Sequence, residues 1–300
     1  MNVNAKIILC GEHAVVYNKP AIALPLKGLD IYCEISNSET NTIDCELYKG
    51  SLDDCPNDLM NIKEIYYHCL KKLNKINNKH HLKFISKIPI ARGLGSSAAS
   101  SASLIKAIYN FYDIKLETEE LFNLCQIAES IAHYNPSGVD ARVITTNKAL
   151  YFSKTLGFKS FDFNLKAGIL IIDSGIIGKT KEAVLKLIKL KDANPIKVNK
   201  ILDQIEMIST KCYKLLKNSD LKAIGHLMNK NHSLLSELDL SNETLDNICK
   251  IANDNGAYGA KLTGGGLGGC VIVLCELADL TNLRSLFEKL KYNCYEARYD

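Results

Sequence analysis

At its most informative point the chain reads Pro89-Ile90-Ala91-Arg92-Gly93-Leu94-Gly95-Ser96-Ser97-Ala98-Ala99. An apolar run at 82–88, typical of a strand, precedes this stretch, and the small residues that follow its two serines favour a helix. Gly93 and Gly95 lack Cβ, so the backbone can turn tightly and bring its N–H groups close to a ligand. The serines suit the start of the helix, whose dipole points its positive end back at the turn. We therefore predict an anion site here, most naturally for phosphate.

The loop is not a Walker loop, because no Gly-Lys-Ser or Gly-Lys-Thr closes it. A plain glycine turn before a helix is the alternative explanation of these residues taken alone. Other segments of the chain must decide between the two.

Composition indicates a globular protein and argues against two classes of partner. The 300 residues predict two domains, at 1–165 and 166–300, and 47% hydrophobic with 23% charged residues is typical of a folded protein. A net charge of +4, carried by scattered lysines, does not favour nucleic acid. No apolar run reaches the ~18 residues that a membrane span requires, and the run at 7–10 is too short for a signal peptide.

Eleven cysteines are spread from Cys10 to Cys294 without any Cys-x-x-Cys pair, and most lie in apolar segments. This pattern favours reduced core thiols over a disulfide framework or a zinc site. We therefore expect a cytoplasmic protein.

The order of elements predicts an α+β fold, because strands and helices mix without regular βαβ alternation. Short strands come first, and further strands frame the helices later in the chain. The expected strands are 6–10, 21–24, 31–36, 42–48, 82–88, 150–153, 160–163, 168–173, 257–262, 270–275 and 294–298. The expected helices are 57–74, 97–111, 118–133, 179–190, 195–217, 220–235, 242–253 and 280–291.

Charged residues flank the first strand. Lys6 begins this strand, and Glu12 and His13 follow it directly after a glycine. A charged pair at a strand end is a natural position for substrate contacts, and Lys6 could serve as a fixed cation. Ordinary strand-end polarity explains the same residues equally well.

A second group of polar residues lies at 128–140. Glu129 falls within an amphipathic helix, and Pro136 with Gly138 predicts a turn that leaves Asp140 just beyond it. Glu129 and His133 have the i, i+4 spacing of a transition-metal pair. Magnesium is favoured instead, because it takes hard oxygens and only one or two protein ligands, so a glutamate and a serine hydroxyl suffice.

The glycine-rich segment at 264–269 follows Lys261 and Thr263 and contains Gly-x-Gly-x-x-Gly. A Rossmann fingerprint would open a helix near the start of a βαβ unit, whereas a strand follows here. A protein kinase would need further motifs downstream, for which no room remains. The segment is left as a mobile backbone between two strands, able to approach a phosphate or another loop.

Together these segments resemble the GHMP kinases, and among them the mevalonate kinases of bacteria. The resemblance covers nearly the whole chain, because three motifs occur in the family's order. Within the family, the strings that favour the mevalonate kinases are Gly-Glu-His-Ala-Val-Val-Tyr at 11–17, Asn-Pro-Ser-Gly-Val-Asp at 135–140, and Asp-Ser-Gly at 173–175 followed by Thr-Lys-Glu-Ala at 180–183. The resemblance implies an N-terminal domain like the second domain of ribosomal protein S5 and a ferredoxin-like C-terminal domain.

The resemblance also implies an ATP-dependent phosphorylation of the C5 hydroxyl of mevalonate, with Mg²⁺ as cofactor. Asp140 would accept or orient the hydroxyl proton, and Lys6 beside it would neutralise charge on the phosphoryl group. The remaining implied roles are ATP binding by Gly93, Leu94, Gly95, Ser96, Ser97 and Ala98, metal binding by Ser97 and Glu129, and substrate contacts by Glu12, His13 and Thr263.

Three positions of the chain depart from the family pattern. Asn4-Ala5 stands where Pro-Gly is common before the lysine, Arg92 replaces a small residue, and Tyr134 replaces a glycine. Arg92 either adds a phosphate contact or points to solvent, and we expect the latter. The alternatives to mevalonate phosphorylation are therefore a phosphomevalonate kinase, a homoserine kinase and a catalytically inactive regulatory protein. We expect a homodimer.

Overall fold

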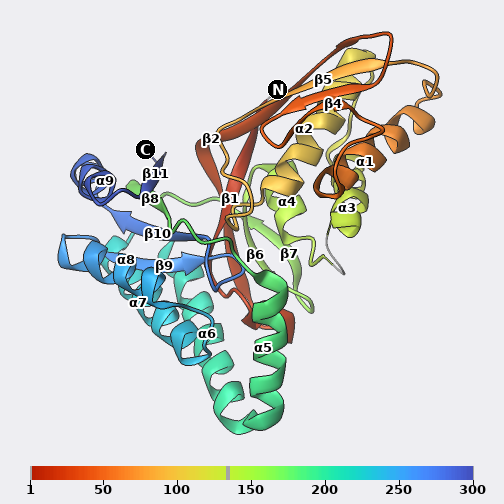
Figure 1. Cartoon of the computed structure of the whole chain (residues 1–300). Helices are drawn as coiled ribbons and strands as arrows, with labels where there is room; N and C mark the ends of the chain where they lie inside the picture. Colours follow the sequence, from red (N-terminus) through yellow and green to blue (C-terminus); the bar gives the residue numbers. More distant parts are fainter. Residues whose placement is uncertain (1, 133–135, 300) are drawn as a thin grey trace. The chain divides into compact units, whose positions relative to one another are not determined.

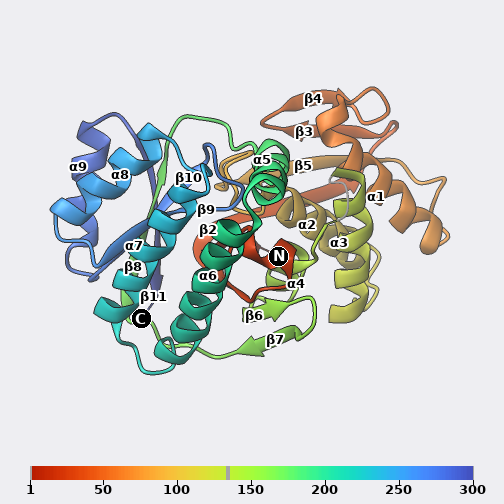
Figure 2. The ribbon, with the colours of Figure 1, turned by 90° about the horizontal axis from the view of Figure 1, so that it is seen from below.

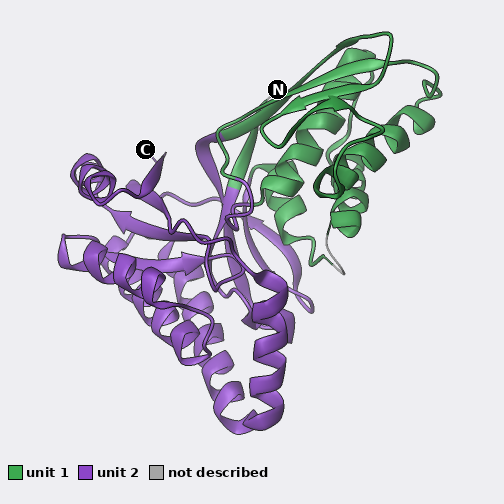
Figure 3. Ribbon diagram, viewed as in Figure 1, with its two compact units in different colours: residues 1–5, 30–89, 95–147 green, residues 6–29, 90–94, 148–300 purple. Residues whose placement is uncertain are grey.

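The computed structural model describes residues 2–132 and 136–299 (Figure 1). The chain forms two compact units that are interleaved along the sequence (Figure 3). Unit 1 comprises Met1–Ala5, Asp30–Pro89 and Gly95–Asn147, and unit 2 comprises Lys6–Leu29, Ile90–Leu94 and Lys148–Asp300. The predicted domain boundary near residue 165 falls within unit 2 and stays a prediction.

Unit 1 contains part of the seven-stranded sheet that the structure describes, together with a group of helices. The strands are β3 (Thr42–Cys45), β4 (Tyr48–Ser51), β5 (His80–Ser86) and the later part of β2 (Ala21–Asn37). β5 is antiparallel to β2 and parallel to β3, and β3 and β4 form a hairpin. The helices are η2 (Asn57–Leu59), α1 (Met60–Lys72), α2 (Ser96–Phe111), α3 (Thr118–Ala132) and α4 (Val139–Thr146).

Helices α1, α2 and α3 pack against one another, and α4 packs against α2 and α3. Ile62, Ile65, Tyr66, Cys69 and Leu70 of α1 are buried at helical spacing, so one face of this helix joins the core. The segment therefore folds as the amphipathic pattern predicts.

Unit 2 contains a sheet in the order β11-β8-β10-β9, with antiparallel neighbours throughout. In chain order, counting from β8, these strands lie fourth-first-third-second, which is the ferredoxin-like arrangement that the resemblance implies. Every residue of β8, β9 and β10 is buried, consistent with their apolar sequences. The strands are β8 (Ala167–Asp173), β9 (Gly259–Thr263), β10 (Cys270–Cys275) and β11 (Asn293–Tyr299).

The helices of unit 2 are α5 (Thr180–Ala193), α6 (Pro195–Leu215), α7 (Leu221–Glu237), α8 (Glu243–Asp254) and α9 (Leu280–Lys289). Helices α7 and α8 pack against β9, α9 packs against β8 and β11, and α5, α6 and α7 pack in succession (Figure 2). The start of α8 is encoded locally, because the side chain of Asn242 accepts a hydrogen bond from the Leu245 N–H at 3.0 Å. Unit 2 also holds η1 (Ala14–Tyr17), the early part of β2, β6 (Ala149–Ser153), β7 (Gly157–Phe161) and most of β1 (Val3–Cys10).

The structure corrects three local predictions. The expected strands 21–24 and 31–36 are one strand, β2, although it contains Pro25 and Gly28. Cross-strand pairing outweighs local propensity there, because β2 pairs with β5 in unit 1 and with β6 in unit 2. The expected strand 42–48 is the β3–β4 hairpin. The helix α4 was not predicted, since only a turn was expected before Asp140.

Candidate active site

The predicted phosphate loop has the backbone that its glycines allow. Gly93 and Gly95 adopt positive φ angles of 81° and 76°. Gly95, rather than a serine, occupies the N-cap of α2, so no cap side chain covers the first N–H groups of this helix. An anion-binding loop requires such uncovered amides. The side chains of Leu94 and Ala98 are buried and anchor the loop on either side of this turn.

The two glycine segments that the sequence analysis singled out meet within unit 2. A Cβ on Gly264 would lie 2.8 Å from the Gly93 Cα, and a Cβ on Gly93 would lie 3.0 Å from the Thr263 carbonyl oxygen. Such distances leave no room for a side chain on either glycine. Contact between the backbones therefore requires glycine at both positions.

Lys6 lies on β1 in the same unit and is buried. Its ammonium group donates a hydrogen bond to the Gly93 carbonyl oxygen at 3.2 Å, and its backbone N–H donates to the Leu94 carbonyl at 3.0 Å. The lysine therefore brings a positive charge to the predicted phosphate loop.

Unit 1 brings the two predicted metal ligands together. The Ser97 hydroxyl on α2 donates a hydrogen bond to Glu129 Oε1 on α3 at 2.7 Å, and Glu129 is buried. Asn61 of α1, which the sequence analysis missed, donates to Ser97 at 3.2 Å and to Ser101 at 3.3 Å. Asn61 belongs to no recognisable sequence motif on this amphipathic helix. Only the packing of α1 against α2 shows that it contacts Ser97.

Asp140 lies in the first turn of α4, two residues after Gly138, which adopts a positive φ of 79° at the N-cap. The carboxylate therefore lies at the positive end of this helix dipole. His133 and Tyr134, considered above as a metal ligand and a departure from the family, lie outside the described residues.

Glu12 and His13 follow β1 in unit 2, and both are buried. Burial raises the pKa of Glu12, although Lys261 acts in the opposite direction. Burial and then the charge of Lys261 lower the pKa of His13 to about 4, so its imidazole is neutral at pH 7. His13 also has a strained backbone, with φ 61° and ψ −43°, which is uncommon for a residue with a side chain.

Lys261 on β9 is a site residue whose role the sequence pattern did not predict. It is fully buried and forms an ion pair with Glu12 Oε1. The sequence contained one sign of this pairing, namely a lysine in a mainly apolar segment just before the glycines. A lysine buried in such a strand is rare unless an acidic group is paired with it.

Thr263 ends β9 and is buried against β1. Its hydroxyl accepts a hydrogen bond from the Ile8 N–H and donates one to the Ile8 carbonyl, both at 3.1 Å. These bonds join the two strands that carry Lys6 and Lys261. The predicted contact of Thr263 with substrate stays a prediction.

Arg92 does not point to solvent. Its Nε donates to Asp173 Oδ2 at 2.7 Å, and Asp173 Oδ1 accepts a hydrogen bond from the Gly175 N–H at 2.9 Å. The expectation of a solvent-exposed arginine is therefore wrong, because the end of β8 supplies a buried carboxylate partner. The pair ties the start of the phosphate loop to the Asp-Ser-Gly segment.

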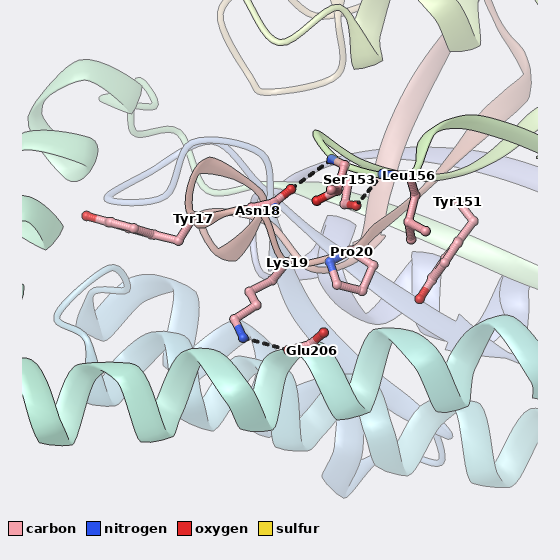
Figure 4. Close-up of a pocket in the computed structure, with 9 residues that line it drawn as sticks. Tyr17, Asn18, Lys19, Pro20, Tyr151, Ser153, Leu156 and Glu206 are labelled. Atoms are coloured by element: carbon pink, nitrogen blue, oxygen red, sulfur yellow. Dashed lines mark hydrogen bonds and ion pairs between the residues drawn. The ribbon is translucent and has the colours of Figure 1, made fainter.

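A separate cavity of about 400 Å³ in unit 2 contains none of the predicted site residues (Figure 4). Lys19 at its wall is paired with Asp203 and Glu206, each at 2.7 Å, so its charge is already balanced. Among the described residues, no group of three His, Cys, Asp or Glu side chains could hold a metal. The eleven cysteines are free thiols.

No helix in the described part of the chain is long and apolar enough to cross a bilayer.

Two family models match the chain. The model "GHMP kinases N terminal domain" matches residues 61–148, and "GHMP kinases C terminal" matches residues 212–296. Mevalonate kinase from Thermococcus sibiricus is 31% identical over 90% of this chain and 87% of its own. The chain therefore belongs to the GHMP kinase family.

Within this family, the similar solved structures include mevalonate kinases. The crystal structure of the Methanococcus jannaschii mevalonate kinase superposes with a TM-score of 0.87 at 28% identity and covers 100% of this chain and 98% of its own. The L. major mevalonate kinase, crystallised with R-mevalonate, superposes with a TM-score of 0.86 at 25% identity over 100% and 95%. The fold is accordingly the two-domain GHMP kinase fold, as predicted.

Proposed function

We propose that this protein is a mevalonate kinase, which transfers the γ-phosphoryl group of ATP to the C5 hydroxyl of mevalonate. The observation that carries the proposal is the Ser97–Glu129 hydrogen bond of 2.7 Å, directly after a glycine loop at an uncapped helix start. The similarity to mevalonate kinases along nearly the whole chain supports mevalonate as the acceptor. Phosphomevalonate and homoserine kinase and an inactive regulatory protein are not favoured.

The residues present fit a magnesium ion. Ser97 and Glu129 offer one hydroxyl and one carboxylate, which are the hard oxygens that Mg²⁺ takes when phosphates and waters complete its shell. When bound, Mg²⁺ would neutralise charge on the phosphates of ATP. Asn61 would hold the serine hydroxyl in place, since it donates to the same oxygen.

Phosphoryl transfer depends mainly on positioning and charge neutralisation. In the proposed mechanism the N–H groups of Gly93, Gly95, Ser96 and their neighbours at 93–98 bind the phosphates. Lys6 adds a fixed positive charge, because its hydrogen bond to the Gly93 carbonyl keeps the ammonium group at this loop.

We assign acceptor binding to Glu12, His13 and Thr263, and hydroxyl activation to Asp140. Asp140 would accept the proton of the C5 hydroxyl or orient this hydroxyl for attack. A neutral His13 can serve as a hydrogen-bond partner of a hydroxy acid without adding charge. A homodimer and a cytoplasmic location belong to the same proposal, and so does the domain boundary near residue 165.

The test measures ADP release by the purified protein with Mg²⁺ and ATP. Mevalonate, phosphomevalonate, homoserine and galactose are offered in parallel at equal concentration. We expect turnover with mevalonate at least ~100-fold above that with the other three compounds. A compound that leaves a buried polar group of the enzyme without a hydrogen-bond partner is strongly disfavoured as a substrate.

Turnover with homoserine or phosphomevalonate but not mevalonate would overturn the acceptor assignment and leave the reaction class standing. ATP binding without turnover of any acceptor would favour the regulatory alternative. Omission of Mg²⁺, with EDTA present, serves as the control for the metal and should abolish ADP release.

A further inference from the structure

Lys261 is the most deeply buried charged side chain around the proposed acceptor site. Its exposed fraction is 0%, and that of its partner Glu12 is 1%. The ammonium group pairs with Glu12 Oε1 and also donates to the carbonyl oxygens of Ile8, at 3.5 Å, and Leu262. Its three hydrogen-bond partners therefore all accept, and together they hold the ammonium group in one place.

Two polar atoms beside this pair have no hydrogen-bond partner among the described residues. They are Glu12 Oε2 and His13 Nε2, and both are buried. The His13 ring is hydrogen-bonded to the backbone of Gly265, and a Cβ on Gly266 would lie 3.4 Å from His13 Nε2. Buried polar atoms normally have partners, so two unmet ones against a glycine loop indicate a place for a polar ligand.

A purely structural role does not account for the ion pair. Apolar residues of similar volume usually stabilise a core as well as a buried ion pair does, because removing two charges from water is costly. Stability alone therefore does not explain the ion pair. Ligand binding does, because Glu12 Oε2 has no hydrogen-bond partner among the described residues and can accept one from a ligand.

We infer that Lys261 is a positioning residue for the acceptor: it holds Glu12 as a carboxylate through Oε1 and leaves Oε2 to accept a hydrogen bond from a hydroxyl group of the substrate. This inference rests on the proposed function and adds a residue to it. An ionised carboxylate is an acceptor only, so the substrate group that it binds is a hydrogen-bond donor, which in the proposed function is a hydroxyl of the acceptor alcohol.

Lys261 is the strongest of the influences that favour an ionised Glu12. Burial raises the pKa of Glu12, and Lys261 is the largest influence that lowers it, followed by a hydrogen bond from the Glu12 backbone and then by the charge of Lys6. Loss of the Lys261 charge would raise this pKa further. The other ionisable groups that sense Lys261 are His13, His232 on α7, which also faces Asp246 on α8, Cys249 on α8, and Cys10, which faces Cys212 on α6.

The test compares the full-length wild type with Lys261→Met, Glu12→Gln and the double variant. It measures kcat, KM for mevalonate and KM for ATP between pH 6 and pH 9. For Lys261→Met we expect KM for mevalonate to rise at least ~10-fold, whereas KM for ATP stays within ~2-fold, because the lost interaction concerns acceptor binding. The acid limb of kcat/KM for mevalonate should move to higher pH, since Glu12 then takes a proton more readily.

The double variant separates positioning from structure. If Lys261 acts through Glu12, Lys261→Met should change KM for mevalonate less than ~2-fold in the Glu12→Gln background. Additive effects, or a double variant that fails to fold while Glu12→Gln folds, would assign Lys261 a structural role and overturn the inference. Lys250→Met, at an exposed position of α8, is the matched control and should behave as the wild type.

The two hypotheses fail in different ways. A wild type that does not phosphorylate mevalonate would contradict the proposed function. The inference would then be tested with whichever acceptor is turned over, whose KM must rise in Lys261→Met. An unchanged KM and pH profile for that acceptor would contradict the inference alone.

Discussion

Single residues in this protein owe their proposed roles to what surrounds them. Ser97 is one of several serines in α2, but it alone is shown between the Glu129 carboxylate and the Asn61 amide. Arg92 carries a charge next to the phosphate loop, but it forms an ion pair with Asp173 at the end of β8, so the carboxylate balances that charge. The side-chain type therefore indicates what a residue can do, and its partners decide which of these uses is available.

Asp140 carries the sharpest prediction at the scale of a residue. Asp140→Asn keeps the size of the side chain but removes its ability to take the hydroxyl proton. We expect kcat to fall by about 10² to 10⁴, while the affinity for ATP, measured by calorimetry, stays within about twofold of the wild type.

Asp113→Asn is a matched control for this substitution, since Asp113 is exposed and its φ of 54° is one that asparagine tolerates. Activity of Asp140→Asn within a few-fold of the wild type would refute the assigned role. A loss of activity beyond a few-fold that is independent of pH would favour orientation of the hydroxyl over proton abstraction.

Secondary-structure elements contribute mainly through their ends. β1 ends at Cys10, and its continuation at Gly11 has a φ of 96° and no room for a Cβ, which would lie 2.4 Å from the Pro20 carbonyl oxygen. β9 ends at the glycine segment, and β8 ends at Asp173. The proposed acceptor residues of unit 2 thus lie where strands stop and backbone groups become available to a ligand.

The contact between the two glycine segments gives a prediction at this scale. Gly264→Ala would place a Cβ 2.8 Å from the Gly93 Cα and would displace the phosphate loop. We expect KM for ATP to rise at least ~10-fold, because the loop amides lose their alignment. The positive φ at this position also lowers the stability of the variant by about 1–2 kcal/mol, because alanine is strained there.

Gly256→Ala separates the clash from the strain. Gly256 has a similar φ of 94°, but nothing lies within 4 Å of the added Cβ. This variant should lose a comparable amount of stability in thermal unfolding and keep its kinetic constants. Equal kinetic effects of the two substitutions would show that the contact between the loops is irrelevant to ATP binding.

At the scale of the whole molecule, each compact unit is assembled from separate stretches of the chain. The chain passes from one unit to the other within β1, within β2, on both sides of 90–94 and once more after Asn147. Unit 2 therefore depends on its N-terminal strand, which carries Lys6 and buries it with Glu12 and His13. Folding of the chain and formation of the proposed site are consequently coupled.

This coupling predicts how stability depends on pH. The pKa of His13 is lowered to about 4 by burial and by Lys261, whereas an unfolded chain has a histidine pKa of about 6.5. The neutral histidine therefore contributes stability that is complete above pH 6.5 and is lost as the pH falls from there toward 4, because the unfolded chain takes up the proton first. The loss between pH 7 and pH 5 should be about 2 kcal/mol.

The measurement is urea unfolding of the wild type and His13→Asn at pH 7 and pH 5. The variant should lose less stability over this interval, by about the same 2 kcal/mol. The raised pKa of Glu12 acts in the opposite direction but is common to both proteins. His226→Asn, at an exposed position of α7, should retain the pH dependence of the wild type, and an identical dependence in His13→Asn would contradict the prediction.

The sequence by itself determined the local chemistry of this protein. The glycine turn at 93–95, the helix start at the following serines and the individual apolar strands of the second sheet are encoded by residues a few positions apart, so they could be predicted. The ferredoxin-like order of those strands was expected only from the resemblance to the family. The same holds for Glu129 and Asp140 as candidates, because their motifs are short.

Only the tertiary structure decided which distant residues meet. Lys261 and Glu12 are 249 positions apart, and Arg92 and Asp173 are 81 apart. Asn61, the continuous strand β2 and the helix α4 likewise depend on packing that overrides local propensity. The physical reason is that a pair of side chains has no local signal: whether a buried charge finds its partner depends on the path of the whole chain.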